Sequence, residues 1–280
     1  MIESSSGIPD PPVPLADTAR QFGAHARGYA VSRFHAEGHT RLLLLEHLEP
    51  VADETLLDLG SGPGHTALAF APYVRRVIVC DLAPEMLHAA TLGARRRADT
   101  MEDGETLAPL ERVVADAHGL PFRDRSLDLV AIRAAAHHFV DLDTALSETR
   151  RVLRRGGRTG IADPTVDDDD PELDAFVNAL ERLRDPTTVR VRAPREWRAA
   201  LERAGLRVDF VEPATHELAE GRSLIEWIAT SGGSSVVLAE AKRMLLTLPR
   251  RMKDALRVRT TGDDVVFDMP RVVITAKRID

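Results

Sequence analysis

The segment LDLGSGPGH, residues 57–65, decides how the chain folds. It carries glycines at alternate positions, namely Gly60, Gly62 and Gly64. The apolar run that leads into it has the length and composition of a buried parallel strand, and residues 64–71 read as a helix. Because glycine has no Cβ, it admits positive φ angles and the close approach of a ligand, and a helix start offers unpaired N–H groups. The segment predicts a strand, a tight turn against a ligand and a helix.

The spacing of these glycines argues against a nicotinamide cofactor. The dinucleotide pattern Gly-x-Gly-x-x-Gly would need its third glycine at position 65, which is His65 in this chain. An NAD-dependent oxidoreductase is therefore disfavoured. A plain strand-to-helix connection without any ligand is the structural alternative.

Strands and helices alternate on both sides of this turn. The strands we expect are residues 55–59, 77–80, 113–114, 127–132, 206–211 and 272–274, with another after Gly157. The helices we expect include one that starts at Pro84 and others near residues 142–153, 171–184 and 194–204. This alternation predicts an α/β fold with a parallel sheet that is covered on both faces.

The two ends of the chain differ in character. Residues 1–15, rich in serine and proline, are expected to form a disordered tail, and residues 16–280 a single domain. An interruption near residues 213–264 separates the last two strands. It contains an amphipathic helical pattern, so we interpret it as a helical cap that acts as a lid or faces a partner.

Composition excludes several classes of function. The net charge of −7 and the pI of about 5.8 give no basic footprint for nucleic acid. The single cysteine, Cys80, rules out an intrachain disulfide framework, and we expect no metal site, because the acidic run at residues 167–170 reads as a solvated loop. No apolar run is long enough to cross a membrane and the start lacks a signal-peptide pattern, so we expect a cytoplasmic protein.

Two aspartates follow the next expected strands. Asp81 ends the second strand and Asp116 ends the third, so both should lie at the sheet edge where α/β proteins bind ligands. A carboxylate at either place could accept hydrogen bonds from a ligand that binds at this edge. Taken singly, either residue could instead be a helix cap or a surface charge.

Residues 56–161 resemble the ubiquinone/menaquinone C-methyltransferase-like group of class I S-adenosylmethionine-dependent methyltransferases. The resemblance rests on the glycine turn, the two aspartates, and the phrases LPF at 120–122, SLD at 126–128 and RVLRRGG at 151–157. It implies a Rossmann-like, seven-stranded, mostly parallel sheet with helices on both faces, S-adenosylmethionine as cofactor and a small-molecule acceptor. A homodimer through the helical cap is a further expectation.

The resemblance also implies which residues hold the cofactor. These are Asp58, Gly60, Gly62, Gly64, Asp81, Leu82, Met86, Asp116, Ala117 and Arg133. Asp81 would accept hydrogen bonds from both ribose hydroxyls, and Asp116 would accept one from the adenine amino group. Met86 would lie on the adenine ring, although it could equally pack in the helix core.

Adjacent histidines follow the fourth expected strand, in the phrase AAHHF at residues 135–139. Histidine exchanges a proton near neutral pH, so His137 or His138 is a candidate general base for an acceptor that attacks the sulfonium methyl. Adjacent side chains point in different directions, so we expect at most one of them to face the substrate. The alternative is that both line the pocket or pack, and that alignment of the reactants does the work.

Another class of function remains open from the sequence. A protein of this fold could bind the cofactor without transferring its methyl group, as a scaffold or a cyclase. A nucleic-acid amino methyltransferase is opposed, because residues 133–136 read RAAA where an Asn/Asp-Pro-Pro-aromatic phrase would be expected.

Overall fold

The computed structural model describes residues 13–101 and 106–280. Most of the tail expected at residues 1–15 therefore lies outside the described residues. The first helix, α1, spans Leu15–Val31 and is followed by a short helix, α2, at Arg33–Glu37.

A seven-stranded sheet forms the centre of the molecule, in the order β3-β2-β1-β4-β5-β10-β6. Its strands are β1 (Thr55–Leu59), β2 (Arg76–Asp81), β3 (Leu110–Val114), β4 (Leu127–Arg133), β5 (Leu153–Pro164), β6 (Arg207–Thr215) and β10 (Arg271–Lys277). Strands β1 to β5 pair in parallel, whereas β10 runs antiparallel to both β5 and β6. The expected α/β fold with a mostly parallel seven-stranded sheet is confirmed.

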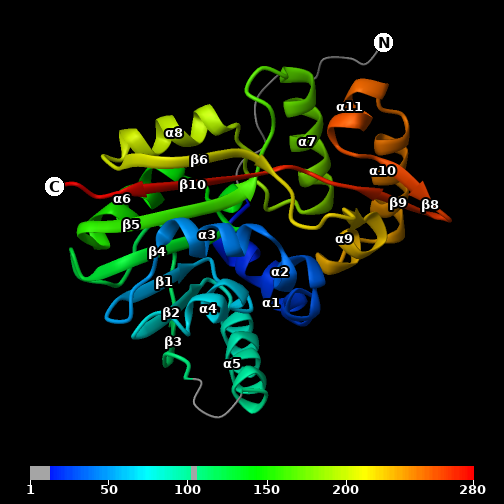
Figure 1. Ribbon diagram of the computed structural model, residues 1–280. Helices are drawn as coiled ribbons and strands as arrows, with labels where there is room; N and C mark the ends of the chain where they lie inside the picture. The colour runs from blue at the N-terminus through cyan, green and yellow to red at the C-terminus, as the bar shows by residue number, and fades with distance from the viewer. Residues whose placement is uncertain (1–12, 102–105) are drawn as a thin grey trace.

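Helices cover both faces of this sheet (Figure 1). One face packs on α6 (Leu142–Val152) and α8 (Pro194–Arg203). The other face packs on α3 (Thr40–Leu48), α4 (His65–Phe70) and α5 (Pro84–Asp99). Alternate residues of the buried strands feed the two layers, because successive side chains of a strand point to opposite faces.

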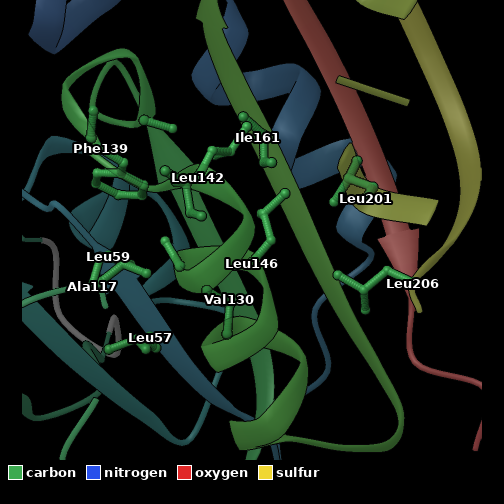
Figure 2. Close-up of a cluster of buried hydrophobic side chains, with 14 of the residues drawn as sticks. Leu57, Leu59, Ala117, Val130, Phe139, Leu142, Leu146, Ile161, Leu201 and Leu206 are labelled. Atoms are coloured by element: carbon green, nitrogen blue, oxygen red, sulfur yellow. The ribbon is translucent and has the colours of Figure 1, made fainter. Parts of the chain in front are cut away.

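The α6–α8 face shows this pattern directly. Leu57 and Leu59 of β1 lie with Val130 of β4 and with Leu142 and Leu146 of α6 (Figure 2). The intervening Leu56 belongs to the opposite apolar layer, with α3 and α4.

A second apolar core lies beside the sheet. It combines α7 (Pro171–Arg184) with α9 (Leu224–Thr230), α10 (Ser235–Leu246), α11 (Arg250–Ala255) and a small sheet of β7 (Arg222–Ser223), β9 (Asp264–Phe267) and β8 (Arg259–Thr261). Figure 1 shows α10, α11, β8 and β9 gathered at one end of the molecule, next to α7. The inserted segment thus shares its core with α7.

None of the helices that the structure describes is both long and apolar enough to span a bilayer.

We expect Trp197→Ala to lower the free energy of unfolding by about 3–5 kcal/mol, because its fully buried indole fills the layer between α8 and the sheet and its removal leaves a cavity. Urea unfolding of both proteins measures the difference. Val236→Ala is the control: this side chain is 75% exposed, and its loss should change stability by less than about 0.5 kcal/mol. Equal effects would contradict the assigned packing.

Candidate functional site

A cavity opens at the carboxyl edge of the sheet, where β1, β2 and β4 end. The empty space inside it, counted together with its open mouth, is about 930 Å³. Nine of the residues expected at the site line it: Gly60, Gly62, Asp81, Leu82, Met86, Asp116, Ala117, Arg133 and His138. Asp58, Gly64 and His137 lie behind this wall.

The glycine turn has the conformation that its residue type suggested. Gly60, Gly62 and Gly64 have φ angles of 66°, 51° and 78°, a region that other residues rarely adopt. A Cβ on Gly60 would come within 2.6 Å of the Ala135 Cβ, and one on Gly64 within 2.9 Å of the Ala90 Cβ. Gly60 therefore lets the turn approach the end of β4, whereas Gly64 serves the contact between α4 and α5.

Asp81 is fixed at the wall of the cavity by two backbone donors. Its Oδ2 accepts from the Gly62 N–H at 2.8 Å, and its Oδ1 accepts from the Ala83 N–H at 2.9 Å. Burial raises the pKa of this carboxyl, although the backbone donors oppose the shift. Each oxygen can accept a further hydrogen bond, so the carboxylate can hold the glycine turn and a ligand together.

Asp58 lies beneath the turn and organises it from below. Its Oδ2 accepts from the Ala67 N–H of α4 at 2.9 Å, so the carboxyl ties the end of β1 to the start of the next helix. Burial raises its pKa to about 7. The side chain supports the ligand-facing turn without lining the cavity.

Asp116 is joined to a histidine that the sequence analysis did not single out. His118 Nε2 accepts from the Asp141 N–H at 3.1 Å, so its proton lies on Nδ1, which donates to Asp116 Oδ1 at 2.5 Å. The His118 N–H donates to the same oxygen at 3.0 Å. His118 also lines the cavity, next to Asp116 and Phe139.

Arg133 connects three segments at the end of β4. Its guanidinium donates to Thr40 Oγ1 of α3 at 2.9 Å, to the His35 carbonyl of α2 at 2.9 Å, and to Glu217 Oε1 at 3.0 Å. Burial would raise the pKa of Glu217, but the charge of Arg133 helps to lower it below its usual value. Its donors serve protein partners, so Arg133 holds the wall of the cavity in place.

The two N-terminal helices cover the cavity. Leu15, Thr18, Phe22 and Tyr29 of α1 and His35 of α2 contribute to its lining. Of the described residues, none between 213 and 264 does so. The apolar side chains of that segment pack against α7 in the second core, and its role as a lid or a partner-facing cap stays a prediction.

The adjacent histidines diverge, as expected for neighbours in the short 3-10 turn Ala136–His138. His137 points to the sheet, where its Nδ1 lies 3.0 Å from Asp163 Oδ1 of β5. His138 lines the cavity, and its Nδ1 lies 2.9 Å from Thr187 Oγ1. The structure brings only His138 to the cavity surface.

Hydrogen bonds fix the tautomer of His138. Thr187 Oγ1 donates to Asp185 Oδ1 at 2.7 Å, because an ionised carboxylate can only accept. The hydroxyl oxygen must then accept from His138 Nδ1–H, which leaves Nε2 with its lone pair free. Burial and the neighbouring His137 lower the pKa of His138 to about 3, so the ring is neutral at physiological pH.

The structure adds residues to the site that the sequence did not identify, and they differ in whether a sequence signal could have found them. Asp163 had one, because it follows a buried strand run near the carboxyl end of β5, as Asp81 does in β2. Thr187 had none, because it comes from a segment far from the glycine turn that only tertiary packing brings to the site.

Known proteins share this fold and turn. The methyltransferase domain model matches residues 57–161. The uncharacterized methyltransferase YcgJ of Bacillus subtilis is 40% identical over 178 residues, which cover 64% of this chain and 67% of the relative. The ubiquinone/menaquinone biosynthesis C-methyltransferase UbiE of Paracoccus denitrificans is 37% identical, over 41% of this chain and 44% of that protein.

A solved structure agrees over most of the chain. The crystal structure of YcgJ from Bacillus subtilis superposes with a TM-score of 0.73 at 30% identity and covers 86% of this chain and 99% of that one. The fold and the glycine turn thus define a Rossmann-like methyltransferase class. This chain belongs to the S-adenosylmethionine-dependent methyltransferase family, and it is an enzyme whose cofactor is S-adenosylmethionine.

We expect Asp58 to make the folded protein less stable as pH rises. Its folded pKa of about 7 lies above the unfolded value of 3.8, so its contribution is present below pH 4 and is lost as pH rises through 7. The loss is up to about 4 kcal/mol. Asp58→Asn should remove this part of the pH dependence.

Urea unfolding of both proteins between pH 4 and pH 8 measures the effect. The free energy of unfolding of the wild type should fall relative to that of Asp58→Asn across this range. Parallel curves would show that the carboxyl titrates normally.

Proposed function

We propose that the enzyme transfers the methyl group of S-adenosylmethionine to a small-molecule acceptor, at a carbon, oxygen or nitrogen atom. One observation carries the proposal: a single cavity is lined by the glycine turn, by two aspartates at strand ends and by a histidine with a free nitrogen. The proposed homodimer through the inserted segment remains a prediction.

The residues on the cavity wall fit the cofactor. Asp81 would accept from the ribose hydroxyls with the lone pairs that Gly62 and Ala83 leave free. Asp116, backed by His118, would accept from the adenine amino group, and Leu82, Met86 and Ala117 supply apolar surface for the ring. The glycine turn, supported from below by Asp58, would face the methionine half, with Arg133 holding the wall.

When bound, S-adenosylmethionine supplies an electrophilic methyl group on a cationic sulfur. His138 would receive the acceptor's proton on Nε2 as the acceptor atom bonds to the methyl carbon. Asp185 and Thr187 would hold the imidazole in the required tautomer. With its lowered pKa, His138 is a weak base, so it would take the proton only as the acceptor atom bonds to the methyl carbon and that proton becomes strongly acidic.

His137 has a different proposed role. Its Nδ1 pairs with the buried Asp163, and it does not line the cavity. We assign His137 the role of holding in place the turn that carries His138.

The name of the Paracoccus relative, a C-methyltransferase of quinone biosynthesis, supports a small-molecule acceptor for this chain as well.

Asp81→Ala should weaken binding of the demethylated cofactor, S-adenosylhomocysteine, by about 10- to 100-fold, since a carboxylate that bonds hydroxyls contributes roughly 1.5–3 kcal/mol. Isothermal titration calorimetry measures the affinity. Asp167→Ala is the control, because this aspartate lies in an exposed loop away from the cavity. Equal affinities of the two variants would rule out Asp81 as the ribose ligand, and a folded wild type that does not bind would refute the cofactor site.

His138→Ala should lower the single-turnover rate of methyl transfer by about 100-fold or more while leaving cofactor affinity nearly intact. His137→Ala should lower this single-turnover rate by a smaller factor. Because the pKa of His138 is lowered to about 3, the wild-type rate should stay level from pH 8 to pH 5 instead of falling near the usual histidine value. Near-normal rates for His138→Ala at every pH would leave reactant alignment as the explanation.

A further inference from the structure

A group of buried charged side chains lies next to the cavity, behind Tyr29 and His35. Arg184 reaches this wall directly, because its Nη2 donates to the Tyr29 hydroxyl at 3.2 Å. Arg271 begins β10 and lies opposite Pro164 of β5, so it is at the same edge of the sheet as the cavity. Arg222 lies in β7 of the second core. The group therefore fills the space between the sheet edge, α2 and the second core.

Most charges in this group are matched. Glu217 pairs with Arg133 at 3.0 Å, and Glu181 with Arg184 at 3.5 Å. The remaining acids have their own partners as well. Asp163 lies 3.0 Å from His137, and Asp268 lies 2.6 Å from His216 and 3.7 Å from Arg257.

Arg222 and Arg271 are the exceptions. They are only 6% and 3% exposed, and neither makes a hydrogen bond or ion pair with any residue that the structure describes. The unpartnered buried atoms are Nε and Nη2 of Arg222 and Nε and Nη1 of Arg271. Acids of the same group act on them at a longer range than an ion pair, namely Asp268 and Glu181 on Arg222, and Glu217 and Asp163 on Arg271. The buried N–H donors themselves are left without an acceptor, which costs about 1–3 kcal/mol for each unsatisfied group.

Aromatic rings lie near the guanidinium groups of both arginines, including those of Trp227 and Phe267 beside Arg222. The Phe34 ring lies 3.9 Å from the Arg222 Cζ and 5.0 Å from the Arg271 Cζ. A ring stacked on a guanidinium covers its face, whereas the N–H donors point outward in its plane. Nε and Nη2 of Arg222 lie on the same side of the guanidinium and form the two-pronged edge that binds both oxygens of a carboxylate.

We propose that Arg222 and Arg271 bind a carboxylate group of the methyl acceptor. This inference rests on the proposed function, because it takes the neighbouring cavity as the site of methyl transfer. The carboxylate would accept two hydrogen bonds from the Nε and Nη2 edge of Arg222 and at least one from Arg271. The acceptor would then extend past Tyr29 towards His138.

Two other features agree with a polar ligand at this place. Burial and the charge of Arg271 lower the pKa of Arg222 to about 9, although Asp268 and Glu181 act in the opposite direction, and a further anion beside Arg222 would raise it. Asp163 Oδ2 and Glu181 Oε2 also lack hydrogen-bond partners, so a bound acid could donate from a hydroxyl as well.

The test uses the full chain saturated with S-adenosylhomocysteine, and sodium acetate as the probe. Acetate is titrated against chloride at constant ionic strength while the arginine Nε–H signals are followed by nuclear magnetic resonance. We expect saturable shifts of the signals of Arg222 and Arg271. Arg222→Gln should weaken acetate binding by at least about tenfold, the loss of one charge-assisted fork.

Arg278→Gln is the matched control, because Arg278 is also buried at 5% exposure but donates to the carbonyls of Arg150, Arg151 and Leu153. It should lose stability but keep its affinity for acetate. Arg222→Lys keeps the charge without the fork and should also bind acetate weakly, so the test stands even where the Gln variant unfolds.

The outcomes separate this inference from the proposed function. No saturable acetate binding, or binding that both Arg222 variants retain, would overturn the carboxylate site. Binding of inorganic phosphate in place of acetate would overturn the choice of a carboxylate. Normal acetate binding in a protein that transfers no methyl group would instead refute the proposed function and leave the anion site intact.

Discussion

The buried guanidinium of Arg133 is the contact on which the site depends. It ends β4, the strand next to the glycine turn, and it bonds α2, α3 and Glu217 at once. Thr40 completes the junction by donating its hydroxyl hydrogen to Glu217 at 2.7 Å. Removing one partner from such a buried pair leaves an uncompensated charge, which costs about 3–5 kcal/mol. The sheet edge, the cover of the cavity and the segment after β6 are therefore held by one set of mutually dependent bonds.

The sequence was most informative where local chemistry determines structure. The alternate glycines predicted positive φ angles, and apolar runs that end in aspartate placed Asp81 and Asp116 at one sheet edge. Both follow from short-range constraints, namely backbone sterics and the common direction of parallel strands. The same reasoning could have included Asp163, since it too lies near the carboxyl end of a buried strand.

Long-range packing decided what the sequence could not. Nothing in the phrase at residues 135–139 tells which histidine faces the cavity, because that depends on Asp163 of β5 and on Thr187 beyond α7. The role of the inserted segment was hidden for a similar reason. Its amphipathic helix predicts an apolar partner without naming it, and that partner is α7 instead of the cavity. Arg133, in turn, lines the cavity and also binds three protein partners that the sequence does not identify, while its contact with the cofactor stays a prediction.

The cover of the cavity has a consequence for how the protein is made. Its residues lie in α1 and α2, which precede every strand of the central sheet, yet their anchor needs Arg133 and Glu217, and the Gln21 amide of α1 reaches the Ser231 carbonyl at 2.9 Å. During synthesis these helices thus leave the ribosome before the sheet. The first surface on which α1 can pack is that of α5, where Ala26 and Tyr29 contact Met86, whereas the partners Glu217 and Ser231 follow only after most of the sheet. Contacts over such separations form late because of their entropic cost. The cover of the active site is accordingly fixed late in folding, although its helices are made before the sheet that it covers.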